Sequence, residues 1–161
     1  MKRIFLLGFL TLIFTVVNVS PVQAEKINFQ WRGEVGYTAK GFFTYDETKA
    51  GEKIKEAGKG QMRVLQSLSV SFYDPLGNRL AGYDNVVGGE STGEYFGFNY
   101  DRSTGKLFGT IDLGGESPGE IYIKGEIKDK LSLYQVGSAY TEISLDRDRG
   151  TLTASNPDRE Y

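Results

Sequence analysis

The chain contains neither cysteine nor histidine. Without cysteine it forms no disulfide bond, so apolar burial and hydrogen bonding have to supply its stability. Without histidine it lacks the usual general base and the commonest metal ligand. These absences exclude Ser-His-Asp and Cys-His catalysis and an ordinary zinc site. Aspartate and glutamate are the main remaining candidates for catalysis, and we expect no cofactor.

An excess of positive charge is also lacking, because the formal net charge is −2. Two basic residues, Lys2 and Arg3, stand in the N-terminal segment described next, so the rest of the chain is more acidic. A nucleic-acid-binding surface needs a basic stripe that neutralises phosphates. We therefore expect no nucleic-acid partner.

The one long apolar run lies near the N-terminus and has the pattern of a secretory signal peptide. Lys2 and Arg3 precede this run over residues 4–17, and Val22-Gln23-Ala24 fits a small-residue cleavage site. A membrane-spanning helix needs about 20 apolar residues, and this run is shorter. The sequence thus predicts a signal-peptide helix in residues 1–24, cleaved after Ala24. The protein is then secreted or periplasmic, with no membrane anchor after cleavage.

The remaining sequence is rich in glycine and aromatic residues, which is typical of short strands joined by tight turns. Apolar and polar residues alternate with a period of two over residues 27–45, which predicts two strands or one long coiled strand. Trp31 in this stretch is expected in the core. Further alternating segments are residues 64–72, 79–83, 95–100, 106–113, 120–127, 131–136, 140–145 and 151–154.

Two segments do not alternate. Residues 46–61 are charged and interrupted by glycine, which predicts a surface loop insertion, with one helical turn at 53–57 as a further option. Residues 155–161 are polar and are predicted to form a flexible tail. The sequence therefore divides into a signal peptide, one β domain over residues 25–154, and the tail.

Three turns share one design, in which a strand is followed by Asp, polar residues, Gly and another strand. They are Asp74…Gly77, Asp101…Gly105 and Asp146…Gly150. Asp accepts hydrogen bonds from its own turn, and Gly takes the positive φ that closes a hairpin. Hairpin after hairpin predicts an all-β fold, a single antiparallel β-sandwich or β-barrel of about 8–10 strands.

Two segments, residues 39–46 and residues 98–107, resemble stretches of a family of small secreted β-rich proteins from cyanobacteria and other bacteria. Ala39-Lys40-Gly41-Phe42-Phe43-Thr44-Tyr45-Asp46 is similar to an A-x-G-x-F-x-Y-D stretch of that family. The hairpin over residues 98–107 is similar to another recurrent piece. Many members carry a PEP-CTERM sorting segment, and its Pro-Glu-Pro motif is absent from this sequence. The resemblance implies a secreted β domain and carries no established activity.

Acidic side chains are the first functional candidates. A glycosidase needs two carboxylates on either side of the scissile bond. Strand residues that could supply them are Glu34, Glu94, Glu120, Glu126 and Glu142. Asp146 and Asp148 have the spacing that begins a calcium loop, but Arg147 and Arg149 alternate with them and turn formation explains both. No catalytic residue and no metal ligand is assigned.

Tyrosines that fall opposite the apolar face of their strands are the second candidates, because exposed aromatic clusters often mark interaction sites. The candidate ligand-binding residues are Tyr73, Tyr122, Tyr95 and Tyr134. Cross-strand pairing of aromatics is the alternative explanation. The sequence favours a non-enzymatic secreted module that binds a carbohydrate or another cell-surface or extracellular component. A calycin-like carrier of a small apolar ligand and a polysaccharide hydrolase with paired Glu are the alternatives.

Overall fold

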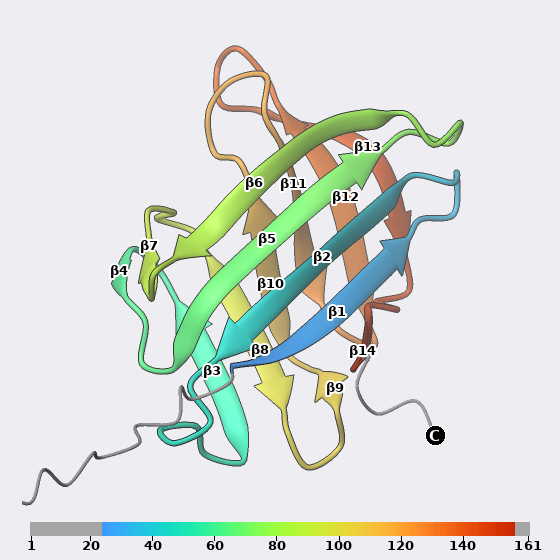
Figure 1. The fold of residues 1–161 in the computed structure, drawn as a ribbon. Helices are drawn as coiled ribbons and strands as arrows, with labels where there is room; N and C mark the ends of the chain where they lie inside the picture. Colours follow the sequence, from blue (N-terminus) through green and yellow to red (C-terminus); the bar gives the residue numbers. More distant parts are fainter. Residues whose placement is uncertain (1–23, 157–161) are drawn as a thin grey trace, which may run out of the picture.

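A computed structural model describes residues 24–156 (Figure 1). Within that range the protein forms fourteen strands and no helix, and two antiparallel sheets pack face to face. The predicted all-β fold is confirmed, and of the two predicted architectures the protein adopts the sandwich. Ten strands have five or more residues, in agreement with the predicted count. The predicted signal-peptide helix lies outside the described residues.

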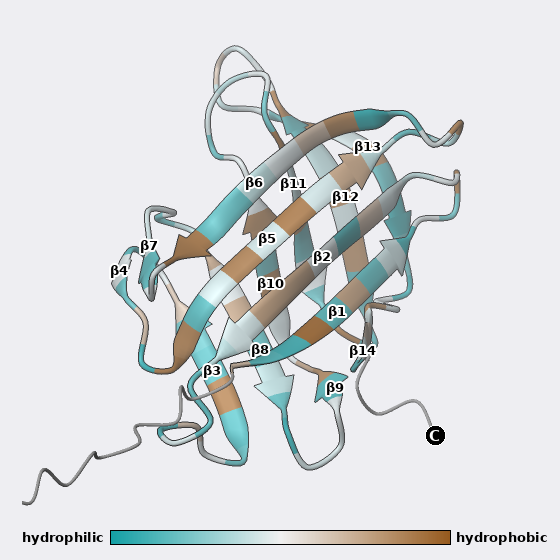
Figure 2. Cartoon of the chain, in the orientation of Figure 1, coloured by the Kyte–Doolittle hydropathy of each residue, from teal (hydrophilic) through white to brown (hydrophobic). Residues whose placement is uncertain are grey.

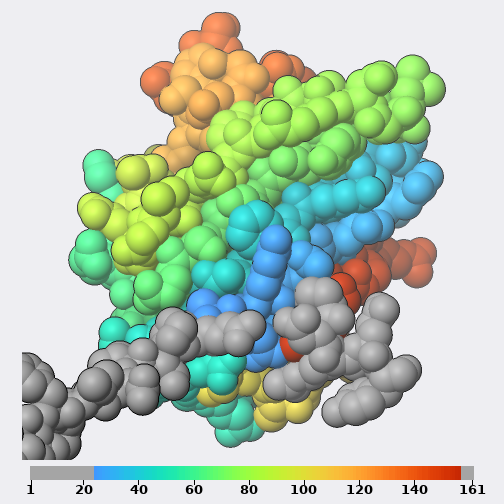
Figure 3. Space-filling model, viewed as in Figure 1, coloured from blue at the N-terminus to red at the C-terminus, as the bar shows by residue number. Residues whose placement is uncertain are grey.

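The first sheet lies at the front in Figure 1 and contains seven strands. In spatial order they are β14 (Thr153–Ser155), β1 (Glu25–Arg32), β2 (Thr38–Tyr45), β5 (Leu65–Tyr73), β6 (Arg79–Val87), β7 (Glu90–Ser91) and β4 (Gly60–Gln61). The outer face of its four long strands forms one continuous surface (Figure 3).

The second sheet lies behind the first in this view. Its strands in spatial order are β13 (Glu142–Asp148), β12 (Lys130–Val136), β11 (Ile121–Glu126), β10 (Thr110–Gly114), β8 (Gly97–Asp101) and β3 (Lys53–Ala57), and β9 (Lys106–Leu107) pairs with β8. Strands β11 and β12 form a hairpin, as predicted. Strand β3 follows β2 of the first sheet in the sequence but pairs with β8 in the second sheet.

Each long strand has one row of buried side chains and one row that faces outward, so hydropathy alternates along it (Figure 2). The inward rows meet in one core. There the Phe43 ring lies 4.7 Å from the Phe98 ring and 4.9 Å from the Tyr100 ring, between ring centroids. Trp31 is fully buried in this core, as predicted. Burial therefore decides which side chains of each strand remain on the outside.

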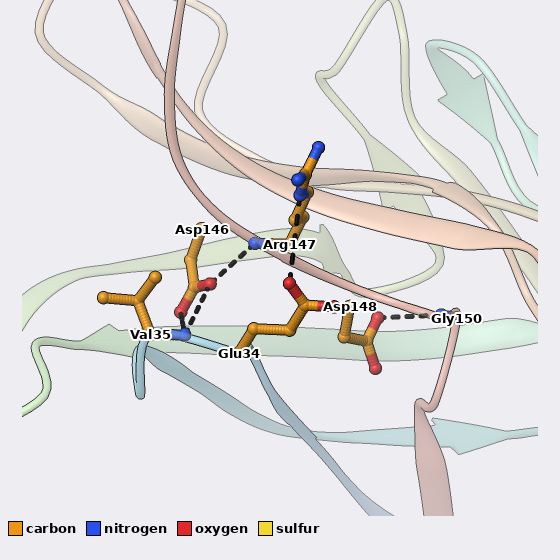
Figure 4. A network of polar contacts seen from close by, with 6 residues as sticks. All are labelled: Glu34, Val35, Asp146, Arg147, Asp148 and Gly150. Atoms are coloured by element: carbon orange, nitrogen blue, oxygen red, sulfur yellow. Dashed lines mark hydrogen bonds and ion pairs between the residues drawn. The ribbon is translucent and has the colours of Figure 1, made fainter.

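The alternation over residues 27–45 folds as the hairpin β1–β2, whose turn is joined to β13. The carboxylate of Asp146, which is only 4% exposed, accepts hydrogen bonds from the backbone N–H of Val35 at 3.0 Å and of Arg147 at 2.7 Å (Figure 4). It also accepts from the Tyr37 N–H at 3.0 Å. Gly33 allows this approach, because a Cβ there would lie 2.2 Å from the Asp146 carboxyl carbon. One buried carboxylate thus fixes an end of the first sheet to the edge of the second.

A buried amide joins the two sheets at a second place, between β6 and the end of β10. The Asn85 side chain on β6 donates to the carbonyl oxygen of Gly114 at 2.8 Å, and its oxygen accepts from the Gly114 N–H at 3.2 Å. The Tyr83 hydroxyl on the same strand accepts from the Ile121 N–H at 3.0 Å. These bonds position the segment between β10 and β11.

The prediction of a surface loop over residues 46–61 is wrong for its second half, which contains β3 and β4. Strand β3 pairs with β8, and the helical turn considered for residues 53–57 does not form. Only Ile54 of β3 is an apolar inward residue, because Glu56 takes the second inward position. Its carboxylate is 5% exposed and accepts a hydrogen bond from the Val64 N–H at 2.8 Å. The apolar–polar alternation that marks a strand is therefore missing here, because a carboxylate occupies a buried position.

The domain also extends beyond the predicted residue 154. Ser155, assigned to the tail, belongs to β14 and pairs with Asn28 of β1. The Asn156 side chain hydrogen-bonds to Glu25. Backbone pairing with an edge strand thus orders residues whose side chains give no apolar signal. Residues 157–161 of the predicted tail lie outside the described residues.

The shared turn design is confirmed for two turns and corrected for the third. Gly77, Gly105 and Gly150 have positive φ values of 88°, 66° and 76°. Asp74 and Asp101 accept hydrogen bonds from their own turns, as predicted. In the third turn Asp148 does so, accepting from the Gly150 N–H at 2.8 Å (Figure 4). Asp146 instead holds the β1–β2 turn.

The contact between Gly33 and Asp146 is open to a double-mutant cycle. Gly33→Ala is expected to cost about 1–3 kcal/mol of stability, because the added methyl group overlaps the carboxyl group. Asp146→Ala is expected to cost about 1–3 kcal/mol, because backbone N–H groups lose their acceptor. In the double variant the overlap is absent, so the cost of Gly33→Ala should nearly vanish. Urea unfolding measures all four proteins, and additive losses would contradict the close approach.

Candidate functional site

An open pocket of about 240 Å³ lies on the outer face of the second sheet. Its lining comes from β10 and β11, from the ends of β12 and β13 that adjoin their turn, and from the segments that join β7 to β8, β10 to β11 and β12 to β13. Three tyrosines and three charged residues stand out in it, namely Tyr95, Tyr122, Tyr140, Asp112, Lys124 and Glu142. The loops β10–β11 and β12–β13 border the pocket and project together beyond the first sheet, in orange and red in Figure 3.

Strand alternation brings two tyrosines together on this face. Ile121 and Ile123 of β11 are buried, so Tyr122 between them faces outward. Tyr134 occupies the paired position on β12. The two rings stack at 5.4 Å between centroids with 24° between their planes. The Nζ of Lys124 lies 5.7 Å from the Tyr122 centroid and 5.5 Å from that of Tyr134, so a cation covers the pair.

Tyr95 stands on the segment before β8 with 73% of its surface exposed. Its backbone is held by Glu116, whose carboxylate accepts from the Tyr95 N–H at 2.8 Å. Glu116 is itself held, because Glu120 accepts from the Glu116 N–H at 2.9 Å. The ring is thus free to meet a ligand while its main chain is fixed.

Glu142 is the ionised carboxylate of the pocket. Lys124 forms a salt bridge with it, and Tyr122 shares a side-chain hydrogen bond with it. These two bonds lower the pKa of Glu142, the bond to Lys124 having the larger effect. The same bond raises the pKa of Lys124. Burial, and then the bond to Glu142, raises the pKa of the Tyr122 hydroxyl. The three side chains form one charged, rigid group beside the tyrosine pair.

The pKa of Asp112 is shifted in the opposite direction from that of Glu142. It projects outward between the buried Ile111 and Leu113 of β10. Burial raises its pKa to about 7, against the effect of Lys124 and with smaller contributions from Glu116 and Glu142. Among the described residues, no hydrogen bond or ion pair engages its carboxyl group. A half-buried carboxyl group without a partner is costly to keep, so it is a ready acceptor for a ligand.

Three of the four sequence-predicted site residues lie on this face of the second sheet. Tyr95 and Tyr122 line the pocket, and Tyr134 stacks against Tyr122. Tyr73 does not join them, because it lies on β5 of the first sheet, where the Lys40 Nζ is 5.7 Å from its ring centroid.

Sequence reasoning missed Asp112, Lys124 and Tyr140. Asp112 and Lys124 sit at outward positions of alternating segments, so the pattern signals their exposure. Their proximity follows only from the pairing of β10 with β11. Tyr140 is an exposed non-glycine residue with a positive φ of 56° in the β12–β13 turn, which no sequence pattern indicates.

Most of the acidic candidates have other partners in the structure. Glu34 pairs with Arg147, Glu94 with Lys59, Glu120 with the β10–β11 loop, and Glu126 with Thr110. Glu142 is the candidate that lines the pocket. Over residues 24–156, no group of three or more acidic side chains has a metal-binding arrangement. The same residues include no helix with the length and apolar character to cross a membrane.

Comparison of the chain with protein-family models, with curated proteins and with solved structures gave no match. The residues of the pocket are therefore the basis for inferring a function.

The Asp112 carboxyl group makes stability depend on pH in a defined direction. Its pKa is about 7 in the folded protein and about 4 in an unfolded chain, so the folded state holds the extra proton between these values. The contribution of this group to the free energy of unfolding is most favourable below a pH of about 4 and is lost as the pH rises through about 7. From pH 5 to pH 8 the native protein should therefore lose stability relative to Asp112→Asn.

Urea midpoints of the two proteins across this range measure the effect, and carboxyl ¹³C NMR of Asp112 gives the titration directly. A constant difference between the midpoints, with a titration near pH 4, would contradict the burial of this group.

Proposed function

We propose that the protein is a secreted module that binds carbohydrate at the pocket on the second sheet. The observation that carries the proposal is the stacked pair of Tyr122 and Tyr134 beside Asp112, whose carboxyl group has no partner among the described residues. A sugar ring presents apolar C–H groups on its faces and hydroxyl groups around its edge. Aromatic rings pack against the faces, and carboxyl oxygens accept from the hydroxyls.

The charges of the pocket favour a neutral carbohydrate. Lys124 is engaged by Glu142, and Asp112 and Glu116 add further carboxyl groups to the lining. An anionic polymer would meet these carboxylates without a free cation from Lys124. A neutral sugar avoids that repulsion and still supplies the hydroxyl donors that Asp112 lacks.

The filled interior favours a surface site over the calycin-like carrier. Phe43, Phe98 and Tyr100 occupy the middle of the sandwich with their rings in contact. A carrier of a small apolar ligand would need a hollow there. The binding role at a cell surface or in the extracellular medium rests on the signal-peptide pattern and on the resemblance to small secreted bacterial proteins.

Tyrosine substitutions test the proposal, with Tyr73 as the matched control. Tyr122→Ala and Tyr95→Ala are expected to weaken binding of a neutral oligosaccharide about tenfold or more, equivalent to about 1.4 kcal/mol. Tyr73→Ala on the other sheet should leave affinity unchanged. Isothermal titration calorimetry with cello-, xylo-, manno- and malto-oligosaccharides is the measurement. The proposal fails when none of these glycans binds, or when Tyr73→Ala weakens binding as much as the other two.

Hydrolysis of a glycosidic bond is the second candidate, and one observation favours it. Asp112 and Glu142 line the same pocket, and their environments move their pKa values in opposite directions. Such a pair can divide acid and base roles. Asp112 would give its proton to the leaving oxygen, and Glu142 would take a proton from the water whose oxygen bonds to the anomeric carbon.

Turnover separates the two functions. The binding proposal expects no release of reducing sugar from the same glycans by the native protein. The hydrolase proposal expects release that falls at least about a hundredfold in both Asp112→Asn and Glu142→Gln. Glu126→Gln, on the same sheet but outside the pocket, is the control for loss of a carboxylate.

A further inference from the structure

The pocket continues into a second hollow on the same face of the sheet. This second hollow, of about 460 Å³, is lined by residues of β3, β8 and β10 that include Lys55, Asn99 and Thr110. Tyr95 and Asp112 line both hollows, so the two meet at these side chains. The first hollow alone is smaller than the range of about 300–1,000 Å³ that is usual for ligand sites, and the second brings the space into that range.

Gly97 lines the second hollow next to Asp112, where the two hollows meet. It is the residue of β8 paired with Asp112 of β10 and with Ala57 of β3. Gly97 has no side chain and Ala57 has only a methyl group. The outward-facing side chains between Asp112 and the edge of the sheet are therefore small and leave space above it. The resulting groove runs across the strands from β11 to β3. Neighbouring strands are about 4.8 Å apart, so this part of the groove is about 14 Å long.

Two of the cations along the groove are already engaged by carboxylates, which suits a neutral chain, and the Nζ of a third, Lys55, lies 5.8 Å from the Phe108 ring centroid. At the end near β3, Arg63 donates to the Lys55 carbonyl oxygen at 2.9 Å and lies 3.8 Å from the Glu56 carboxylate. The guanidinium is thus already engaged, like Lys124 at the other end. The Asn99 amide donates to the Thr110 carbonyl oxygen at 2.7 Å, which fixes its orientation beside the groove.

We infer that the groove binds a linear neutral polysaccharide along its length, with several consecutive sugar residues in contact, rather than a single terminal sugar. This inference rests on the proposed carbohydrate-binding function and extends it. Tyr122, supported by the stacked ring of Tyr134, holds one part of the chain, Tyr95 and Asp112 hold the part at the junction, and Asn99 faces the part near β3.

The test is affinity against chain length. Oligosaccharides of two to six residues, in the linkage that binds best among the cello-, xylo-, manno- and malto- series, are titrated calorimetrically into the native protein. Affinity should rise at least tenfold between the disaccharide and the tetrasaccharide. A Cβ at Gly97 would meet its nearest atoms at 3.5 Å, an ordinary contact, and its φ is not in the positive region. Gly97→Val should therefore fold, narrow the second hollow beside Asp112, and remove the gain with length.

Asn99→Ala gives an independent second variant, with Asn28→Ala on the outer face of the first sheet as its matched control. Asn99→Ala should weaken the tetrasaccharide and leave the disaccharide unchanged, and Asn28→Ala should change neither. Equal affinity for all lengths, with no effect of Gly97→Val or Asn99→Ala, would overturn the extended groove and leave carbohydrate binding intact. Failure of every glycan to bind would overturn both.

Discussion

The contact between Phe43 and Phe98 joins the two sheets, and the arrangement of the pocket depends on it. Their rings meet at 4.7 Å in the middle of the sandwich, one from each sheet. Because one face of each strand is committed to this core, the other row of side chains has to point outward. On the second sheet that outward row carries Tyr122, Tyr134 and Asp112. The chemistry on the surface is thus a consequence of packing in the interior.

Polar side chains fix segments of the sandwich that apolar packing alone does not position. Asp146 fixes the β1–β2 turn to β13, the edge strand of the second sheet, and Asn85 on β6 fixes the end of β10. Near the pocket, Glu116 and Glu120 hold the backbone around Tyr95. Buried polar groups with matched partners add specificity to a fold, because any other arrangement leaves them unsatisfied. Asp146, Asn85 and Glu120 act in this way without lining the pocket, whereas Glu116 also lines it.

Sequence alternation was sufficient to predict the all-β fold and the outward position of Tyr122 and Tyr134. It failed where a polar residue took an inward place, as Glu56 does in β3. It could not identify Asp112 as a site residue, because the residues that line the pocket with it come from β11 and from the segment before β8. Tyr73 was selected on the same grounds as Tyr122 and lies on the opposite sheet. Which side chains of a strand face inward can be predicted from the sequence. Strand order depends on long-range pairing and could not be predicted.

The central claim is that carbohydrate binds on the outer face of the second sheet. The most direct measurement is a ¹H–¹⁵N NMR titration of the labelled protein with the tetrasaccharide that binds best. The largest shift changes should occur in β10, β11, β12 and around Tyr95, with the outer face of β1, β2 and β5 unchanged. Shifts concentrated on the first sheet, or among core residues such as Phe43 and Phe98, would contradict the account.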